Sequence, residues 1–259
     1  MTEPLAGSQQ SGQRGRVRIE PGRKRIRALI GGRAVVDTIR PMYVWEKPRY
    51  PAYYVPRHDV RAQLVETEER RHSPSRGAGV VYDVRIGGQD RAGAALAYPD
   101  SPIEALRPLV RFEWAAMDEW LEEDEPVYTH PRDPYTRVDI LASSRHVRIS
   151  VNGILLAESH QPRMLFETHL PPRYYLPMTD VRMELLRPSS SETHCPYKGM
   201  ATYWDVVLDD GTVIKDLVWT YRAPLPESQR IAGLLAFYDE HVDVEVDGEP
   251  QERPRTPFS

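Results

Sequence analysis

Two stretches decide the fold: Tyr53-Tyr54-Val55-Pro56-Arg57-His58-Asp59-Val60-Arg61 and Tyr174-Tyr175-Leu176-Pro177-Met178-Thr179-Asp180-Val181-Arg182. They lie 121 residues apart, and six of their nine positions are identical. Each residue type supplies only a few per cent of an average protein, so chance is a poor explanation for the match. The chain is therefore interpreted as two copies of one domain.

Further matches extend the repeat on both sides of these stretches. Residues of the same or a similar type recur at this spacing, which becomes one to four residues longer in the later part of the repeat. The matched pairs are Gly32 with Gly153, Pro41 with Pro162, His72–Gly77 with His194–Gly199, Tyr82-Asp83-Val84 with Trp204-Asp205-Val206, and Phe112 with Phe237. A repeat of about 110 residues is a normal size for one domain.

The domain boundaries follow from the extent of these matches. We predict a first repeat over residues 16–122 and a second over residues 136–249. Residues 123–135 between them are acidic and contain proline, which is typical of a linker. Residues 1–15 and 250–259 are polar, and we predict disordered tails there.

The local patterns predict a mainly β fold with one short helix in each repeat. The 24 prolines and the scarcity of long apolar helical runs favour strands and turns. Alternating apolar residues around turn residues indicate hairpins. The predicted hairpins are 147–156, around Asn152-Gly153, and 200–221, around Asp209-Asp210-Gly211. Further strands are expected at 183–186 and 237–246, and helices at 227–235, after Pro226, and near 103–110.

Composition limits the class of protein. A net charge of −4 over 259 residues argues against nucleic acid as a partner, and the local basic cluster over residues 14–27 reads as the solvent face of a strand. No apolar run is long enough to span a membrane, and the N-terminus lacks the apolar core of a signal peptide. The single cysteine excludes an internal disulfide. A cytoplasmic protein is expected, and its oligomeric state stays open.

At these motifs the chain resembles a family of bacterial and fungal proteins, the domain-of-unknown-function family four-two-seven. The matching pieces are Tyr-Tyr-x-Pro-x-x-Asp, Thr193–Gly199, Tyr203–Val206, Trp219-x-Tyr221, the closing segment from Phe237, and an acidic segment at 120–125 between tandem copies. The resemblance implies a Mss4-like, or β-tent, fold, in which two small antiparallel sheets lean together. B-type methionine sulfoxide reductases and the ligand-binding domain of cereblon share that fold. The family's label points to nucleotidyltransferases, but no residue pattern here supports that activity.

The chain departs from these wider relatives at their metal site. Many of them hold zinc with two Cys-x-x-Cys pairs, and a closed zinc site needs four Cys or His ligands. Cys195 is the only cysteine, and His194 beside it would point to the opposite face of a strand. We therefore predict no metal and no cofactor.

Cys195-Pro196-Tyr197-Lys198-Gly199 is the main candidate site. Its proline and glycine suit a hairpin turn with a bulge, and the first repeat keeps only these two residues. The turn does not require Cys195, Tyr197 or Lys198. A nearby cation would activate Cys195 as a nucleophile, and Lys198 could hold an anionic group. A turn alone, a ligand site, and a catalytic cysteine all remain open.

Aromatic residues and one acid complete the candidate set. Trp204, Trp219 and Tyr221 could wall a pocket for a planar or cationic ligand, although strand aromatics usually belong to a core. Alternation places Trp204 on the face opposite Tyr203, and Trp219 on the same face as Tyr221. Asp180 either caps a turn or acts as an acid or base in the pocket.

These observations leave two hypotheses for the function. In the first, the second repeat binds or transforms an unidentified small molecule, with Tyr197, Lys198 and the aromatics as ligand-binding residues and Cys195 and Asp180 as candidate catalytic groups. In the second, the chain is a protein-interaction or scaffold module without a catalytic site. A concave pocket beside Cys195 would favour the first. A filled core with an exposed apolar patch would favour the second.

Overall fold

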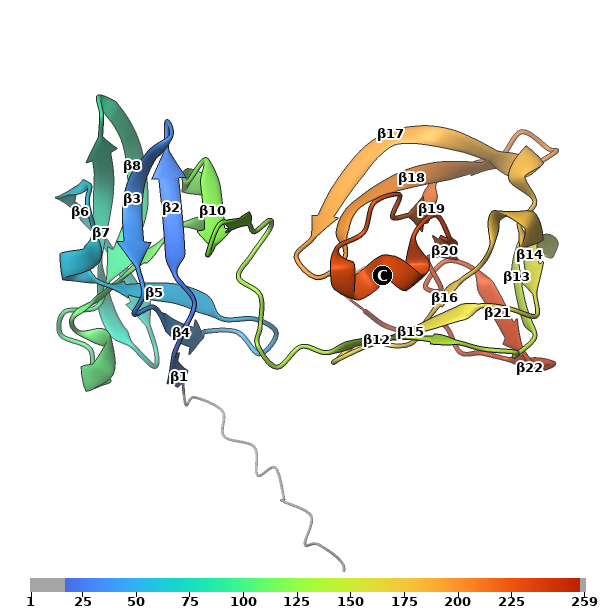
Figure 1. The fold of residues 1–259 in the computed structure, drawn as a ribbon, viewed down its shortest axis with the longest axis horizontal. Coiled ribbons are helices and arrows are strands. Elements are labelled where there is room, and N and C mark those ends of the chain that lie inside the picture. The colour runs from blue at the N-terminus through green and yellow to red at the C-terminus, as the bar shows by residue number, and fades with distance from the viewer. Residues whose placement is uncertain (1–16, 257–259) are drawn as a thin grey trace, which may run out of the picture. The chain divides into compact units, whose positions relative to one another are not determined.

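The computed structural model describes residues 17–256 and contains two compact units, which divide between Val127 and Tyr128. This division lies within the predicted linker, 123–135. Residues 125 and 126 form a short strand of the first unit, and the chain from Tyr128 onward belongs to the second. Each unit holds one repeat and is built almost wholly from antiparallel strands (Figure 1).

The first repeat consists of two sheets. A seven-stranded sheet has the order β1-β4-β5-β9-β8-β7-β6, and a four-stranded sheet has the order β11-β10-β2-β3. Figure 1 shows β2, β3 and β10 side by side. The strands are β1 Arg18–Pro21, β2 Ile26–Ile30, β3 Arg33–Thr38, β4 Met42–Trp45, β5 Ala52–Pro56, β6 Gln63–Ser73, β7 Gly77–Ile86, β8 Gln89–Ala97, β9 Leu109–Phe112, β10 Glu119–Glu122 and β11 Glu125–Pro126.

The second repeat has the same strand order in three sheets, β12-β15-β16, β17-β18-β19-β20 and β14-β13-β21-β22. The first two are joined by a bridge between Leu176 and Leu235, which exchange backbone hydrogen bonds of 2.8 and 2.9 Å. The strands are β12 Val138–Ala142, β13 Val147–Val151, β14 Ile154–Ser159, β15 Arg163–Glu167, β16 Arg173–Tyr175, β17 Leu186–Cys195, β18 Gly199–Val207, β19 Val213–Thr220, β20 Leu235–Phe237, β21 Asp243–Val246 and β22 Glu249–Pro250.

The paired tyrosines of the repeated motif each serve a different core. Successive strand residues point to opposite faces, so the two rings separate. Tyr53 and Tyr174 enter the main core of their repeat. Tyr54 and Tyr175 enter a second, smaller cluster on the other face of the same strand. The motif thus supplies one aromatic ring to each side of the same strand.

The two hairpins predicted in the second repeat are confirmed. β13 and β14 pair around Asn152 and Gly153, whose positive φ values of 50° and 76° suit a tight turn between twisted strands. β18 pairs with β19 beyond the predicted Asp209-Asp210-Gly211 turn. The fold is mainly β, as predicted.

The predicted helices are wrong in extent. In place of 103–110 and 227–235 the structure has 3-10 turns, η2 Glu104–Leu106 and η6 Pro226–Ile231. The remaining 3-10 turns are η1 Arg57–Asp59, η3 Trp114–Ala116, η4 Met178–Asp180 and η5 Met183–Leu185. The last residues of both predicted helices instead join β9 and β20, because pairing with β8 and β19 satisfies their backbone groups.

Three other predicted segments also differ from the structure. The strand expected at 183–186 is mostly η5, and the strand expected at 237–246 is broken between β20 and β21. Residues 250–256, predicted as a tail, continue from β22, and Arg253 forms an ion pair of 2.8 Å with Asp243. The predicted tail over residues 1–15 lies outside the described residues.

Candidate functional site

The Cys195-Pro196-Tyr197-Lys198-Gly199 motif is the turn between β17 and β18. Cys195 pairs with Gly199 across the hairpin, and residues 196–198 form the turn. Gly199 has a φ of 96°, and a Cβ atom there would approach the Leu225 nitrogen to 3.4 Å. The hairpin geometry predicted from the proline and glycine is therefore present.

Lys198 is the buried charge of this turn. Its side chain is 10 % exposed and forms an ion pair with Glu167, the last residue of β15, which is 9 % exposed. Burial alone would lower the pKa of the Lys198 ammonium, but the neighbouring Cys195 and Glu167 raise it above its ordinary value. Lys198 is therefore charged at neutral pH, paired with the carboxylate of Glu167 and influenced by the neighbouring thiol of Cys195.

The ammonium of Lys198 has one N–H donor to spare. An ammonium carries three donors, and Glu167 and Cys195 are the side chains that interact with it among the described residues. A buried donor without an acceptor costs free energy. The site can therefore offer this donor to an acceptor oxygen.

Aromatic rings surround the half-buried Cys195. The aromatic cluster consists of Tyr175, Tyr203, Trp219, Tyr221 and Tyr238, against which Cys195 packs. Trp219 donates a 3.1 Å hydrogen bond from Nε1 to the Tyr175 hydroxyl, and its ring lies 4.6 Å from that of Tyr238. Burial raises the pKa of Tyr175 and Tyr221, so their hydroxyls stay protonated at neutral pH.

The structure brings together five of the residues singled out from the sequence: Cys195, Tyr197, Lys198, Trp219 and Tyr221. Trp204 lies elsewhere, because the alternation along β18 turns it toward the main core of the second repeat. It pairs in register with Val218, and it packs there with core residues.

Asp180 has a turn-forming environment. Its carboxylate accepts a 2.6 Å hydrogen bond from Ser159 Oγ and another from Thr179. In the first repeat, Asp59 accepts a 2.6 Å hydrogen bond from Thr38. The shared arrangement favours the capping interpretation of Asp180 over an acid–base role.

The first repeat carries a matching cluster with different chemistry. Ser73 stands at the position of Cys195, Arg76 at that of Lys198, and Glu46 at that of Glu167. Arg76 forms an ion pair with Glu46 and donates a 3.1 Å hydrogen bond from Nε to Ser73 Oγ. Arg111 adds a second guanidinium, 2.9 Å from Glu46. The buried cation–carboxylate pair is thus common to both repeats, whereas the thiol and the amine occur only in the second.

Glu167 was not among the residues predicted from the sequence, although the repeat itself could have indicated it. Glu46 and Glu167 are 121 residues apart, which is the spacing of the repeated Tyr-Tyr motif. Glu167 ends β15 and Glu46 directly follows β4, and each of these strands pairs with the Tyr-Tyr strand of its repeat. A match of two glutamates, each preceded by an aromatic residue, could have indicated a shared carboxylate.

A second buried charge cluster borders the aromatic cluster. Arg173, on β16, contacts Glu240 through two hydrogen bonds of 2.8 and 2.5 Å and lies 3.2 Å from Asp239. Two carboxylates therefore share one guanidinium. Burial raises the pKa of Asp239 to about 7, only partly offset by Arg173. These residues were not predicted, because nothing in the sequence joins Arg173 to residues more than 60 positions later.

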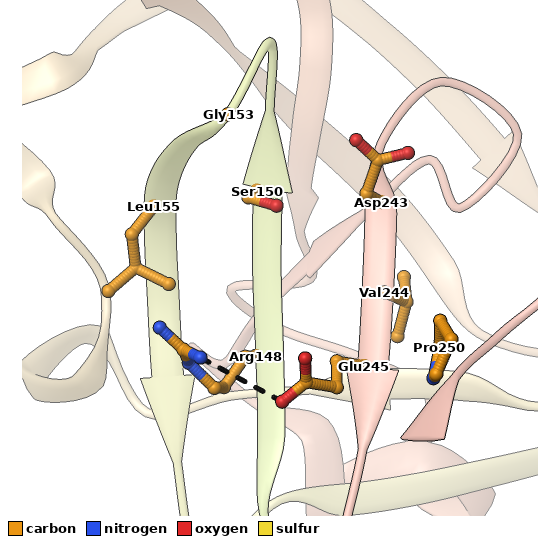
Figure 2. A pocket seen from close by; sticks show the side chains of 8 residues that line it. All are labelled: Arg148, Ser150, Gly153, Leu155, Asp243, Val244, Glu245 and Pro250. Carbon is orange, nitrogen blue, oxygen red and sulfur yellow. Dashed lines mark ion pairs between the residues drawn. The ribbon is translucent and has the colours of Figure 1, made fainter. Parts of the chain in front are cut away.

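A hollow of about 210 Å³ lies apart from the motif, over β13, β14 and β21 (Figure 2). Its charged side chains already have partners. Arg148 and Glu245 face each other at 3.8 Å, and Asp243 is paired with Arg253. Its lining residues include none of the predicted site residues. This hollow has no feature that selects a ligand.

The described residues offer neither a cluster of metal ligands nor a membrane-spanning helix. Within residues 17–256, no group of three or more His, Cys, Asp or Glu side chains is placed to hold a metal ion. In the same part of the chain, no helix is long and apolar enough to cross a membrane.

Comparison with known proteins defines the family. The family described as a domain of unknown function (DUF427) matches residues 18–123 and, separately, residues 139–248. No curated protein matches the chain. The two matched regions coincide with the two structural repeats and together cover more than half of the sequence. The chain therefore belongs to the DUF427 family, of which it carries two tandem copies.

Proposed function

We propose that the second repeat binds a small molecule at the turn formed by Cys195 and Lys198, and that Cys195 contacts the bound molecule. The main support for this proposal is the buried Lys198 ammonium. It is paired with Glu167, lies beside the Cys195 thiol and keeps one N–H donor unused. The partner proposed is thus a small molecule rather than a nucleic acid or a membrane.

The comparison between the repeats separates structural from functional features. Both repeats hold a buried cation against a glutamate, so that pair supports the fold in each. Arg76 also donates to Ser73, which stands where the second repeat has its thiol. In the second repeat, Lys198 and Cys195 stand at the positions of Arg76 and Ser73, so an ammonium and a thiol replace a guanidinium and a hydroxyl. The second repeat is therefore the one proposed to bind.

The charges limit the class of ligand. Glu167 already compensates Lys198, so a ligand with several negative charges would leave net charge in a site with little access to water. A carbonyl or a single carboxylate oxygen suits the remaining N–H donor. A flat ring would extend from it along Trp219 and Tyr221. We propose a small planar molecule that carries one such oxygen.

The test is a thermal-shift screen of metabolites on the full chain, with two variants copied from the first repeat. Lys198→Arg and Cys195→Ser reproduce residues that the fold already accepts at these positions, whereas Lys198→Ala would leave Glu167 unpaired. A ligand at a hundred times its dissociation constant adds roughly 2.7 kcal/mol to the stability of the protein. We expect a planar carbonyl or carboxylate compound to raise the melting temperature of the wild type and not of Lys198→Arg. No shift with any compound, while all three proteins melt cooperatively, would contradict the proposal.

A protein-interaction or scaffold role is the second candidate, and one observation favours it. The matching Arg76–Glu46 pair shows that a buried ion pair at this turn serves a repeat that has no thiol. In that case Cys195 is a packing residue. Cys195→Ser would then leave every binding property of the chain unchanged.

Two broader assignments belong with this proposal. We infer a β-tent, Mss4-like relationship, supported by the small antiparallel sheets of the repeats, two in the first and three in the second. We also infer a cytoplasmic location, supported by the single free cysteine. An experimental structure and fractionation of cells, respectively, would test them.

A further inference from the structure

The first repeat carries one more cation at its turn than the second repeat does at the matching place. Two guanidinium groups, those of Arg76 and Arg111, pair with the carboxylate of Glu46. The three side chains are only 15 %, 20 % and 13 % exposed, respectively. The second repeat has Ala236 at the position of Arg111, since each precedes a matched phenylalanine and faces the strand before it in the same register. A single ion pair at the turn, as in the second repeat, therefore does not account for Arg111.

Two other acidic side chains lie near these guanidinium groups, but both are more accessible to water. Glu113 is 35 % exposed and divides its carboxylate between Arg111 and Arg71. Glu69 is 52 % exposed and pairs with Arg71. Exposed carboxylates are hydrated and screened, so they compensate a buried cation less than Glu46 does. The more deeply buried part of the cluster thus holds two cations against one anion.

Several donors of this cluster are unused among the described residues. Arg111 Nε is buried and has no hydrogen-bond partner there. Arg76 donates a 3.1 Å hydrogen bond from Nε to Ser73 Oγ and directs Nη1 at Glu46, which leaves Nη2 without an acceptor in residues 17–256. Tyr98 is 2 % exposed, and in the same part of the chain its hydroxyl makes no hydrogen bond. Buried donors without acceptors cost free energy, so this cluster favours an added acceptor.

Strand pairing places these groups on one face of the seven-stranded sheet. Arg111 on β9 lies opposite Tyr54 on β5 and Leu96 on β8, and residues opposite each other on paired strands share a face. Tyr98 follows two positions after Leu96 and packs in the same cluster. The guanidinium of Arg76 lies over its ring, 5.1 Å from the ring centre.

The Tyr98 hydroxyl is a donor at neutral pH. Burial raises its pKa, although the nearby charges of Arg76, Arg111 and Arg71 act in the opposite direction. The influence of all three guanidinium groups on one hydroxyl also shows that they gather around it. The hydroxyl and the guanidinium groups can therefore act on the same small group.

We propose that the first repeat binds a small oxyanion, a carboxylate or a phosphate group, at the cluster of Arg76 and Arg111, with the Tyr98 hydroxyl as a further donor. A guanidinium presents its N–H donors in a planar fork that matches two oxygens of either group. One negative charge balances the excess cation, which is costly to bury alone.

This site goes beyond the function proposed for the second repeat and differs from it in chemistry. The second repeat offers one donor of a compensated ammonium beside Trp219, which suits a flat ring. The first repeat has Leu96 at the position of Trp219 and adds a guanidinium instead. The fold thus holds two sites of different charge, one in each repeat.

Isothermal titration calorimetry of the full chain, at one ionic strength, tests the proposal with inorganic phosphate and, separately, with acetate. Acetamide serves as the ligand control, because it has the shape of acetate without its charge. We expect saturable binding of one equivalent of phosphate or acetate, and none of acetamide. Binding of phosphate alone would identify a phosphate group as the ligand, and binding of acetate alone a carboxylate. No saturable binding of either anion would overturn the proposal.

Two variants locate the binding. Arg111→Ala copies Ala236 and leaves one cation against Glu46, an arrangement that the second repeat shows to be compatible with the fold. We expect it to raise the dissociation constant of the anion about tenfold or more, because charge-assisted hydrogen bonds are lost. Tyr98→Phe removes one hydroxyl and keeps the ring, and should raise the dissociation constant about two- to tenfold. Equal dissociation constants in wild type and Arg111→Ala would overturn the proposal.

Arg61→Ala is the matched control for charge. It removes a guanidinium from the same repeat, but one that is 58 % exposed and pairs with Asp37. We expect this variant to bind the anion as tightly as wild type. Equal losses in Arg61→Ala and Arg111→Ala would overturn the site, since net charge alone would then explain the binding.

The anion site and the site proposed in the second repeat can fail separately. Lys198→Arg should bind phosphate or acetate as wild type does, because Lys198 belongs to the other repeat. Anion binding that is lost in Lys198→Arg and kept in Arg111→Ala would overturn the anion site and support the second-repeat site. Anion binding that is lost only in Arg111→Ala, together with a metabolite screen that finds no ligand for the second repeat, would support the anion site and contradict the other proposal.

Discussion

Replacing Lys198 with methionine should destabilise the second repeat strongly. Methionine keeps the length of the side chain and removes the charge, so the buried carboxylate of Glu167 loses its cation. Both side chains are about one-tenth exposed, so water screens the pair only weakly. A pair of unit charges 4 Å apart attracts by about 4 kcal/mol at the effective dielectric of a protein near its surface. Breaking one partner of a buried pair typically costs about 3–5 kcal/mol.

The cost comes from the stranded carboxylate rather than from the pair itself, which a double variant can demonstrate. Lys198→Met with Glu167→Gln removes both charges and should recover most of the lost free energy. Lys198→Arg should cost much less, because Arg76 holds Glu46 in the same way in the first repeat.

Urea unfolding of the four proteins, followed by fluorescence and far-ultraviolet circular dichroism, measures these free energies. Because the chain holds two units, the transitions of the two repeats are fitted separately if the two signals do not coincide. A loss below about 1 kcal/mol for Lys198→Met would refute the reasoning, since it would place Lys198 among ordinary exposed ion pairs. A double variant as unstable as the single one would refute the role of the stranded charge.

Three further predictions concern other parts of the chain. Asp180→Ala and Asp59→Ala should each lower the free energy of unfolding by about 1 kcal/mol, because each loses a turn hydrogen bond. Neither change should alter ligand binding or the alkylation of Cys195. If Asp180→Ala alone changed ligand binding or alkylation, its acid–base role would be restored. Gly199→Ala should destabilise by about 1–2 kcal/mol in urea unfolding, because its φ of 96° is unfavourable for a residue with a Cβ, and a neutral substitution would contradict this account. The pKa of Asp239 is raised to about 7, so the folded state binds a proton that the unfolded state releases. The stability that this group contributes is therefore present in acid and is lost as the pH rises toward 7. Between pH 5 and pH 8 the melting temperature of Asp239→Asn should fall less steeply than that of wild type, and parallel profiles would exclude the effect.

The repeat was predictable from the sequence because a duplicated backbone needs the same residues at the same places. The Tyr-Tyr pair fills two cores from one strand, and Asp59 and Asp180 close the same turn with a hydroxyl partner 21 residues earlier. Hairpins were predictable for a related reason. Their turn residues and alternating strands are neighbours along the chain, as at Asn152-Gly153.

The predicted helices failed for the opposite reason. A proline start signal and a few apolar residues at 227–235 suit a helix locally, yet backbone pairing with β19 draws the end of that segment into β20. Tertiary hydrogen bonds outweigh a weak local preference. The same holds at the C-terminus, where Gln251 donates a 2.8 Å hydrogen bond to the Val244 carbonyl in a stretch whose composition suggested disorder.

The sequence by itself determined that this protein is a tandem DUF427 chain of mainly β structure, with its distinctive thiol and amine in the turn of the second repeat, because repetition, alternation and turn chemistry are written along the chain. Only the tertiary structure decided which of the candidate residues meet. It placed Glu167 against Lys198, separated Trp204 from Trp219, and set the Asp133 N–H against the Tyr197 hydroxyl. The two contacts join residues that are 31 and 64 positions apart in the sequence, and the two tryptophans lie on opposite faces of one sheet. Both outcomes depend on how the strands pair and on which face each side chain takes.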